Sequence, residues 1–417
     1  MKSLRSLFRI GLGPSSSHTM GPNRAAKEFS KRCPDVDNYR VTLYGSLAAT
    51  GEGHMTDVAI LSVLKPIAPT ELIWKPETFL PFHPNGMLFE GIKEERVIDK
   101  WTIYSIGGGE LANEETTKNE EDIYPLTTIH DIMDWCDETG CSFWEYVELH
   151  EGSGIWEFLA EVWETMKSTI QRGLENEGVL PGGLGIQRKA CTYMLKSASY
   201  TSSVKSKAKI YAYALATSEE NASGSTVVTA PTCGSCGVLP AVLYHLYQEH
   251  ISSEARILRA LATAGLFGNI AKENASISGA DVGCQGEIGV ACAMTAAAAC
   301  QLFGGTITQI EYAAEMGLEH HLGLTCDPMC GLVQVPCIER NAVAASRALD
   351  ACTYATLSDG KHKIDYDRIV EVMKETGHDL PSLYKETSTG GIAKIDINKR
   401  RGIKKILDTL HIHNKEN

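Results

Sequence analysis

A long segment without a charged side chain, Ile288–Ile310, constrains this chain more than any other feature. Its length would be enough to span a bilayer. However, it consists mainly of Ala, Gly, Thr, Cys and Gln, which insert into membranes weakly. A helix with no polar face must be covered by other elements of the protein. We therefore predict a buried, tightly packed core helix, and we expect no membrane insertion.

The sequence before about residue 125 mixes strands and helices. Arg40–Ala49 and Lys100–Gly107 are rich in β-forming residues and partly alternate between polar and apolar side chains. Helical stretches are expected after Pro22 and after Thr56. The acidic and polar stretch Glu110–Pro125 is typical of a loop.

From about Thr127 onward, segments with a helical period dominate. They are Trp156–Ile170, Ser203–Thr217, Glu254–Ala271, Glu287–Phe303 and Glu339–Thr353. Thr308 and Glu311 have the spacing of a capping box, which predicts a helix start at Thr308. We predict an α+β protein with an N-terminal α/β domain over residues 1–130. A larger all-α domain over 150–395 and a tail over 396–417 would follow it.

The bulk composition argues against several classes of protein. The chain of 417 residues has a net charge of −13, whereas proteins that bind nucleic acid or anionic membranes normally present a basic face. The densest basic run, Lys399–Lys405, is typical of a solvated helix face. Thirteen scattered cysteines do not resemble a secreted disulfide framework, and Leu7–Ile10 is too short for a secretory signal. We expect a cytoplasmic protein without a nucleic-acid or membrane partner.

A turn rich in hydroxyl groups, Gly13–Thr19, precedes a predicted helix over Met20–Lys31. Hydroxyls and free N–H groups at a helix N-terminus can bind a carboxylate or phosphate. Within this turn, His18 could carry a proton near neutral pH. The alternative is an ordinary Ser/Thr cap of the helix.

Glycine-rich segments recur at predicted strand ends, at Tyr44–His54, His83–Met87 and Tyr104–Gly109. Glycine lets the backbone approach a ligand closely, and each segment also holds a hydroxyl, amide or imidazole group. Taken singly, each also fits a plain turn. None contains a nucleotide-binding glycine fingerprint or a P-loop lysine.

Five cysteines form two constellations. Cys233 and Cys236 make a C-x-x-C pair, which suggests redox chemistry, metal binding or simply two buried thiols. No second such pair lies at zinc-finger spacing. Cys284 and Cys337 lie at predicted helix N-termini, where the thiolate is favoured, and Cys326 follows a helix. Three such thiolates could hold three irons of an iron–sulfur cluster and leave one iron as a Lewis acid. The alternative is three buried structural cysteines.

Taken together and in this order, these segments resemble the iron–sulfur L-serine dehydratases in their single-chain form, over nearly the whole chain. The matching segments are Leu7–Pro22, Tyr44–Asp57, His83–Met87, Tyr104–Gly109, Glu177–Leu184, Val228–Pro231, Asn274–Cys292, Glu319–Pro328, Val333–Ala342 and Glu386–Ala393.

The resemblance implies a small domain similar to an allosteric substrate-binding fold, a helical catalytic domain and a homodimer. It implies a [4Fe–4S] cluster held by Cys284, Cys326 and Cys337, and conversion of L-serine to pyruvate and ammonia. His18 would be the base that takes the Cα proton. The substrate would be bound by Ser15, Ser16, Ser17, Thr19, His83, Asn85 and Ser105.

Two departures from the family pattern leave questions open. The tail has no cysteine to ligate the fourth iron, so water or another group such as Cys330 could occupy it. Cys233 stands where the family usually has Asn. Alternative functions are a cluster-dependent lyase for cysteine or threonine, a hydro-lyase for a hydroxy acid, a zinc-dependent enzyme, or a non-catalytic serine and redox sensor.

Overall fold

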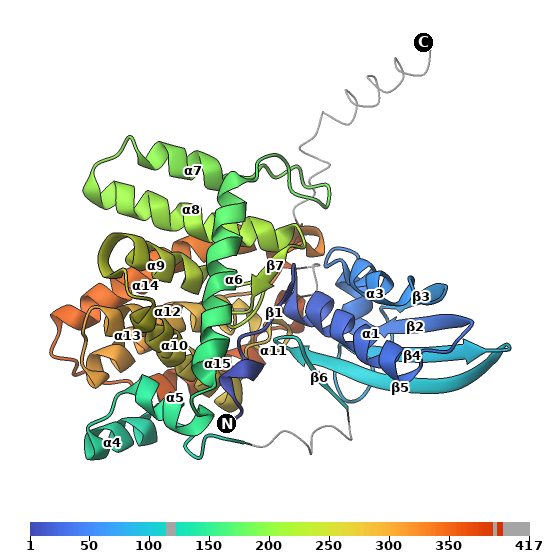
Figure 1. Cartoon of the computed structure of the whole chain (residues 1–417), viewed down its shortest axis with the longest axis horizontal. Coiled ribbons are helices and arrows are strands. Elements are labelled where there is room, and N and C mark those ends of the chain that lie inside the picture. Colours follow the sequence, from blue (N-terminus) through green and yellow to red (C-terminus); the bar gives the residue numbers. More distant parts are fainter. Residues whose placement is uncertain (114–121, 387–389, 395–417) are drawn as a thin grey trace, which may run out of the picture.

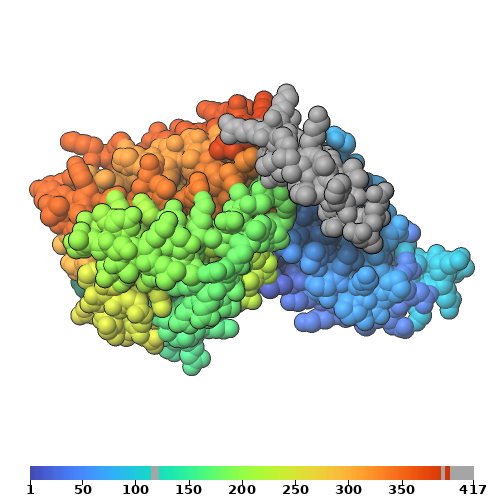
Figure 2. All heavy atoms as spheres, turned by 90° about the horizontal axis from the view of Figure 1, so that it is seen from above, coloured from blue at the N-terminus to red at the C-terminus, as the bar shows by residue number. Residues whose placement is uncertain are grey.

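The computed structural model describes residues 1–113, 122–386 and 390–394, and the basic run near the tail lies outside them. The chain forms a small sheet-containing domain beside a larger helical domain (Figure 1). The space-filling view shows the two as adjoining masses of unequal size (Figure 2). The predicted α+β class, with a β-rich region first and a larger helical region after it, is therefore confirmed.

The small domain is built on a five-stranded sheet with strand order β3-β2-β4-β5-β6. Only the β2–β3 pair is parallel, because the crossover between these strands contains helices α2 and α3. The elements are α1 (Gly21–Arg32), β2 (Asn38–Tyr44), α2 (Gly45–Thr50), α3 (Thr56–Leu64), β3 (Thr70–Lys75), β4 (Gly86–Lys93), β5 (Arg96–Gly107) and β6 (Glu110–Ala112).

Helices α1 and α3 cover one face of this sheet. Phe29 of α1 lies at the centre of that layer, with its ring centroid 5.5 Å from Phe89 and 6.5 Å from the Trp101 ring, on which it stacks. Ile60 and Leu64 of α3 are fully buried in the same core. This packing fixes the start of α1, and the hydroxyl-rich turn lies immediately before it.

The larger domain consists mainly of helices, and the predicted helical segments are confirmed. Its helices are α4 (Ile129–Thr139), α5 (Phe143–Glu151), α6 (Ile155–Glu175), α7 (Ala190–Ser197), α8 (Ser202–Ala222), α9 (Val238–Leu246), α10 (Glu254–Asn274), α11 (Gly279–Val282), α12 (Ile288–Leu302), α13 (Ile307–Glu319), α14 (Cys337–Leu357) and α15 (Tyr366–Asp379).

Helix α12 is the predicted core helix, and every residue from Ile288 to Cys300 is buried. It packs against α9, α10, α13 and α14. Small side chains permit this close packing: a Cβ added to Gly317 of α13 would lie 2.9 Å from the backbone of Ala293. Among the described residues, no single helix is long and apolar enough to cross a membrane. Only the bent pair Gly279–Gln285 and Ile288–Leu302 meets that test of length and composition.

The first residues pack into the helical domain, although they fall within the predicted range 1–130. Leu4 and Phe8 are fully buried and lie against Gly265 of α10. Strand β1 (Ile10–Leu12) then pairs antiparallel with β7 (Thr226–Val228), so the chain enters the small domain from the helical one. The domain limits given above otherwise stay a prediction.

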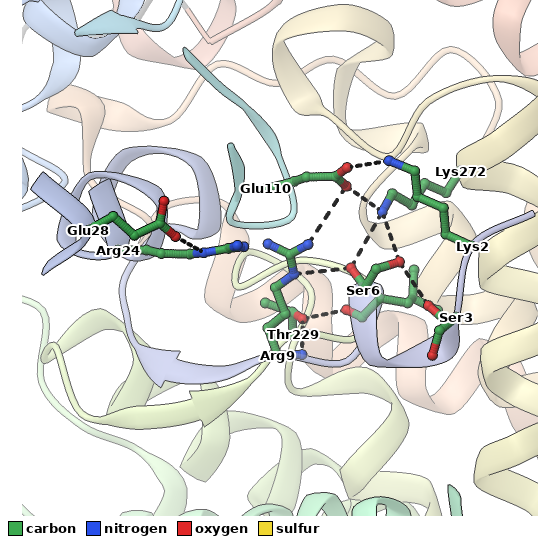
Figure 3. Close-up of polar contacts among 10 residues, drawn as sticks. Lys2, Ser3, Ser6, Arg9, Arg24, Glu28, Glu110, Thr229 and Lys272 are labelled. Atoms are coloured by element: carbon green, nitrogen blue, oxygen red, sulfur yellow. Dashed lines mark hydrogen bonds and ion pairs between the residues drawn. The ribbon is translucent and has the colours of Figure 1, made fainter. Parts of the chain in front are cut away.

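An ion cluster fastens the β5–β6 turn to this N-terminal segment and to α10 (Figure 3). The carboxylate of Glu110 lies 2.8 Å from Lys2 Nζ and 2.7 Å from Lys272 Nζ, with Arg9 at 3.8 Å. Burial alone would raise the pKa of Glu110, but Lys272 and Lys2 lower it to about 2. The carboxylate is therefore ionised, and it holds the two domains together beside the Gly107–Gly109 turn.

Three local predictions were wrong. Arg40–Ala49 is a strand only to Tyr44, because α2 starts at Gly45, whose φ of 51° turns the chain. The predicted loop Glu110–Pro125 begins with a strand, β6, that Glu110 anchors.

The capping box of α13 is Thr306 with Gln309, two residues earlier than predicted. Glu311 is buried and accepts a hydrogen bond from Tyr366 N at 2.7 Å instead of capping the helix.

Candidate functional site

The hydroxyl-rich turn forms one helical turn, Ser16–Met20, that continues directly into α1. Ser15 is its N-cap, and its side chain accepts a hydrogen bond from His18 N at 3.1 Å. Thr19 Oγ1 donates to His54 O at 2.7 Å and accepts from Ser15 N at 3.1 Å. Ser16 is buried in the same turn. The side chains of Ser15 and Thr19 thus stabilise the turn, and the turn holds the backbone of His18 in place.

The His18 imidazole is fully buried among neutral groups. Its Nδ1 lies 2.8 Å from Ser17 Oγ, and its Nε2 lies 3.2 Å from Ser46 Oγ at the start of α2. The His54 ring lies 4.5 Å away between centroids. Burial, followed by the charge of His54, holds the pKa of His18 well below its usual value. The imidazole is therefore neutral near pH 7, and one ring nitrogen can accept a proton.

The predicted substrate-binding residues from the other glycine-rich segments lie beside this turn. Asn85 Nδ2 donates to Ser105 O at 3.2 Å, and Asn85 N donates to His83 Nδ1 at 3.1 Å. The position that a Cβ would take on Gly21, at the start of α1, is occupied by the Ser105 side chain. The charge of His83 also contributes to lowering the pKa of His18. We call His18, Ser46, His54, His83, Asn85 and Ser105 the imidazole site.

Three buried polar atoms of the imidazole site have no hydrogen-bond partner among the residues that the structure describes. They are Asn85 Oδ1, Ser105 Oγ and His83 Nε2. A buried polar group without a partner is costly, so such atoms commonly mark the place of a ligand. Both acceptors and donors are available here, which suits a small zwitterionic molecule.

The predicted cluster ligands converge in the helical domain. Cys284 lies just before α12, Cys337 is the first residue of α14, and Cys326 lies on the loop after α13. All three are buried, and donor atoms of Cys284, Cys326 and Glu287 lie within 4.8 Å of one another. Glu287 Oε2 is 4.0 Å from Cys284 Sγ and 3.8 Å from Cys326 Sγ.

Further charged groups complete this region. Glu386 N donates to Cys326 O at 2.7 Å, which brings Glu386 Oε1 to 3.9 Å from Cys326 Sγ. The Arg340 guanidinium, held by a 2.7 Å bond to Thr325 O, interacts electrostatically with Cys284 and Cys337. We call Cys284, Cys326, Cys337, Glu287, Glu386 and Arg340 the thiol site.

The interaction between Cys284 and Cys326 shifts the pKa values of the two thiols in opposite directions. The Cys326 S–H donates to Cys284, which lowers the pKa of Cys284; burial opposes this effect and Arg340 supports it. The same hydrogen bond, together with burial, raises the pKa of Cys326 well above its usual value. Burial also raises the pKa of Cys337. The cost of burying more than one thiolate here calls for a bound cation to neutralise the charge.

The donor set fits an iron–sulfur cluster. Thiolates are the usual protein ligands of such clusters. A Cβ on Gly279 would lie 3.1 Å from Cys326 Sγ and 3.0 Å from Glu287 Oε2, so a side chain there would intrude on the donor atoms. Cys284, Cys326 and Cys337 would be the ligands.

One loop connects the two sites. Met20, at the end of the His18 turn, contacts Cys233 with 3.8 Å between the sulfur atoms. Thr232, the residue before it, donates to Glu287 Oε1 at 2.7 Å. Asn341 of α14 fixes the same loop by donating to Gly234 O at 2.7 Å. A second connection exists between His83 and Asp281 of α11, whose charges interact.

Among the described residues, the group of donor atoms within 4.8 Å of one another does not include Cys233, Cys236 or Cys330. Cys233 and Cys236 are buried with Met20 and Val227, and burial raises the pKa of both thiols. Cys330 is exposed and lines a cavity of about 410 Å³. That cavity is formed by Ala48, Ala49, Thr50, Glu52, Gly53, Trp74, Cys330 and Gly331.

Residue-by-residue reasoning missed several groups of the two sites. His54 and Ser46 lie in the glycine-rich segment Tyr44–His54 but carry no separate signal. Glu287 follows Cys284 by three residues and is the N-cap of α12, whereas Cys284 lies in the short turn before that helix. Glu386 and Arg340 come near the thiols only through tertiary contacts.

Comparisons with known proteins agree with this architecture. The family described as serine dehydratase alpha chain matches residues 94–393, and serine dehydratase beta chain matches residues 3–72 and 64–116. The L-serine dehydratase of Streptomyces coelicolor is 40% identical and aligns over 94% of this chain and 98% of its own. L-serine dehydratase 1 of Escherichia coli is 40% identical over 94% and 99%, and the Helicobacter pylori enzyme is 36% identical over 94% and 98%.

Proposed function

Because this chain belongs to the serine dehydratase family, we propose that it is an L-serine ammonia-lyase that uses a [4Fe–4S] cluster held by Cys284, Cys326 and Cys337. The products would be pyruvate and ammonia. The observation that carries the proposal is the convergence of buried thiols with Glu287 at the start of α12. The family match supports the reaction, and the donor set supports the cofactor.

Dehydration of serine poses two chemical problems. The hydroxyl is a poor leaving group, and the Cα proton is weakly acidic. A bound cluster would supply Lewis acidity for departure of the hydroxyl. The protein itself has to remove the proton and hold the substrate so that both events occur at neighbouring carbons.

His18 is suited to removing the proton. Its depressed pKa keeps the imidazole neutral, and the Ser15–Thr19 turn fixes the ring by backbone hydrogen bonds. Contacts with Ser17 and Ser46 orient the two ring nitrogens. A fixed neutral base at the end of a rigid helix needs little reorganisation in the transition state.

The imidazole site would bind the ionic groups of serine. Asn85 Oδ1 can accept from the ammonium, and Ser105 Oγ can donate to the carboxylate, because both atoms are buried and neither has a partner within residues 1–113, 122–386 and 390–394. His83 would lie beside them. Ser15, Ser16, Ser17 and Thr19, also predicted to bind substrate, would act mainly by shaping the turn, since the hydroxyls of Ser15, Ser17 and Thr19 have local partners.

Loss of the Cα proton and of the hydroxyl gives aminoacrylate and water. This enamine tautomerises to an imine, and water then hydrolyses the imine to pyruvate and ammonia. We expect the protein to be cytoplasmic, because a reducing compartment keeps thirteen thiols free and preserves an oxygen-sensitive cofactor. We expect a homodimer.

The test is an anaerobic preparation assayed for pyruvate release from L-serine, L-threonine and L-cysteine. We expect L-serine to give the highest kcat/KM. A preparation that binds L-serine without turning it over would instead favour a sensor, and zinc without labile sulfide would favour a zinc enzyme. Neither outcome is compatible with the proposal.

A further inference from the structure

The carboxylate of Glu287 occupies an unusual position for a half-buried acidic group. Glu287 is the N-cap residue of α12. Cys284 lies in the short helical turn Gly283–Gln285, immediately before that helix. Glu287 Oε2 faces two of the three predicted ligand sulfurs, at 3.8 and 4.0 Å. Among the described residues, it supplies the only oxygen of the group of three donors that lie within 4.8 Å of one another.

The other oxygen of Glu287 is held in place. Thr232 Oγ1 donates to Oε1 at 2.7 Å, and Ser235 Oγ lies 3.2 Å from the same Thr232 hydroxyl. Metal ligands in proteins are commonly oriented by a hydrogen bond of this kind to the atom that does not bind the metal. Oε1 is thereby engaged, and Oε2 is directed toward the sulfurs.

Glu386 also faces the thiol site but is placed differently. Its Oε1 lies 3.9 Å from one sulfur, that of Cys326, and its backbone has a φ of 55°. Glu287 instead contacts two sulfurs from the rigid start of the core helix. The two side chains therefore form a natural pair for comparison, because both are half-buried carboxyl groups near Cys326 Sγ and they differ in their geometry toward the sulfurs.

Three thiolates leave one iron of a four-iron cluster without a protein sulfur. We propose that Glu287 Oε2 is the fourth protein ligand while no substrate is bound, and that Thr232 orients it. The inference rests on the proposed function, since it requires the cluster. Carboxylate oxygen is a hard, exchangeable ligand compared with thiolate.

A carboxylate ligand would give the site an exchange mechanism. When L-serine enters, one oxygen atom of the substrate would replace Glu287 Oε2, and the displaced carboxylate would keep its bond to Thr232. No electron is transferred in this exchange, and the number of ligand oxygens is conserved. Between turnovers, Glu287 would then occupy the coordination position of the iron that has no thiolate ligand.

The experiment compares Glu287→Gln with Glu386→Gln in protein loaded anaerobically with ⁵⁷Fe. Mössbauer spectra without serine should show about one quarter of the iron in an oxygen-ligated environment in the wild type. Glu287→Gln should change that component, whereas Glu386→Gln should preserve it. Mild oxidation by ferricyanide, which releases one ferrous ion and leaves a three-iron cluster, should be at least ~10-fold faster in Glu287→Gln.

Thr232→Val supplies a second variant that retains the carboxylate. It should accelerate iron loss less than Glu287→Gln and leave the thiolate-bound irons unchanged. Identical spectra and rates in the wild type and Glu287→Gln would overturn the ligand assignment while the cluster itself stands. Equal acceleration in Glu386→Gln would also overturn it, because charge alone would then explain the effect. Wild-type protein without iron and sulfide would overturn the proposed function as well.

Discussion

The imidazole site and the thiol site are buried to a similar degree but differ in how they handle charge. His18 in the first is surrounded by hydroxyls and other imidazoles, and burial keeps it neutral. The second gathers two carboxylates and three thiols around one guanidinium, so it holds more acidic groups than its cation can balance. We therefore propose that the imidazole site acts as a neutral base and that the thiol site binds a cationic partner.

In the proposed function, this difference would give the two domains separate tasks. The small domain would contribute the proton acceptor His18 and the buried atoms that bind the ends of the substrate. The helical domain would contribute the cluster ligands, two of which lie at the starts of helices, where the backbone favours negative charge. The loop that holds Thr232 and Cys233 joins them.

The largest effect is expected from Cys326→Ser. Removing one thiolate should remove or destabilise the cluster and lower kcat/KM for L-serine by about 10³-fold or more, because several kcal/mol of Lewis-acid stabilisation are lost. Iron analysis and turnover of anaerobic protein measure this. Cys33→Ser makes the same chemical change at a buried thiol of the small domain and should retain iron. Full iron content in Cys326→Ser would refute that ligand.

Replacing the base should separate the two sites. His18→Ala should lower kcat by about 10²–10⁴-fold, the usual contribution of a general base, while the visible absorption of the cluster stays unchanged. His245→Asn, at a buried imidazole that contacts Ser206, is the matched control and should remain active. Full turnover by His18→Ala with its cluster intact would eliminate His18 as the base.

The neutral state of the imidazoles should make stability depend on pH. His54 has a pKa of about 4 in the folded protein, against about 6.5 when unfolded, because burial disfavours its charged form. Between these values the unfolded chain binds the proton preferentially, so stability falls as the pH falls from 6.5 toward 4. Urea unfolding should show that His54→Asn removes about 3 kcal/mol of this acid destabilisation. An unchanged pH dependence would show that His54 is not the group responsible.

The smallest effect is expected from Ser105→Ala. The Ser105 hydroxyl is buried and has no partner in the described part of the chain, so its removal should leave the free energy of unfolding unchanged or slightly higher. If the hydroxyl binds the substrate carboxylate, KM for L-serine should rise about 10-fold or more. Steady-state kinetics and urea unfolding on the same preparation measure both quantities. A lower free energy of unfolding with an unchanged KM would show that the Ser105 hydroxyl stabilises the fold and does not bind the substrate.

The sequence predicted the parts of the molecule that depend on periodicity and spacing. The core helix could be recognised from Ile288–Ile310 because a helix without charge must be covered, and α12 is buried over nearly its whole length. Cys284 and Cys337 could be placed at helix starts because flanking Gly and Pro residues mark those boundaries.

Features that depend on tertiary contacts could not be derived in this way. The conversion of strand to helix at Gly45 requires a left-handed backbone that the sequence pattern does not specify. Glu386 approaches Cys326 from a segment 60 residues away, and Glu110 is ionised because Lys2 and Lys272 meet it from two other segments. Secondary-structure propensity and local residue spacing do not predict tertiary contacts of this kind.

The most direct test of the account is the composition of protein purified without air, measured together with its turnover. We predict about four iron atoms and about four labile sulfides per chain, with pyruvate released from L-serine in proportion to the iron content. Folded protein that releases pyruvate from L-serine but contains neither iron nor labile sulfide would contradict the account at its foundation.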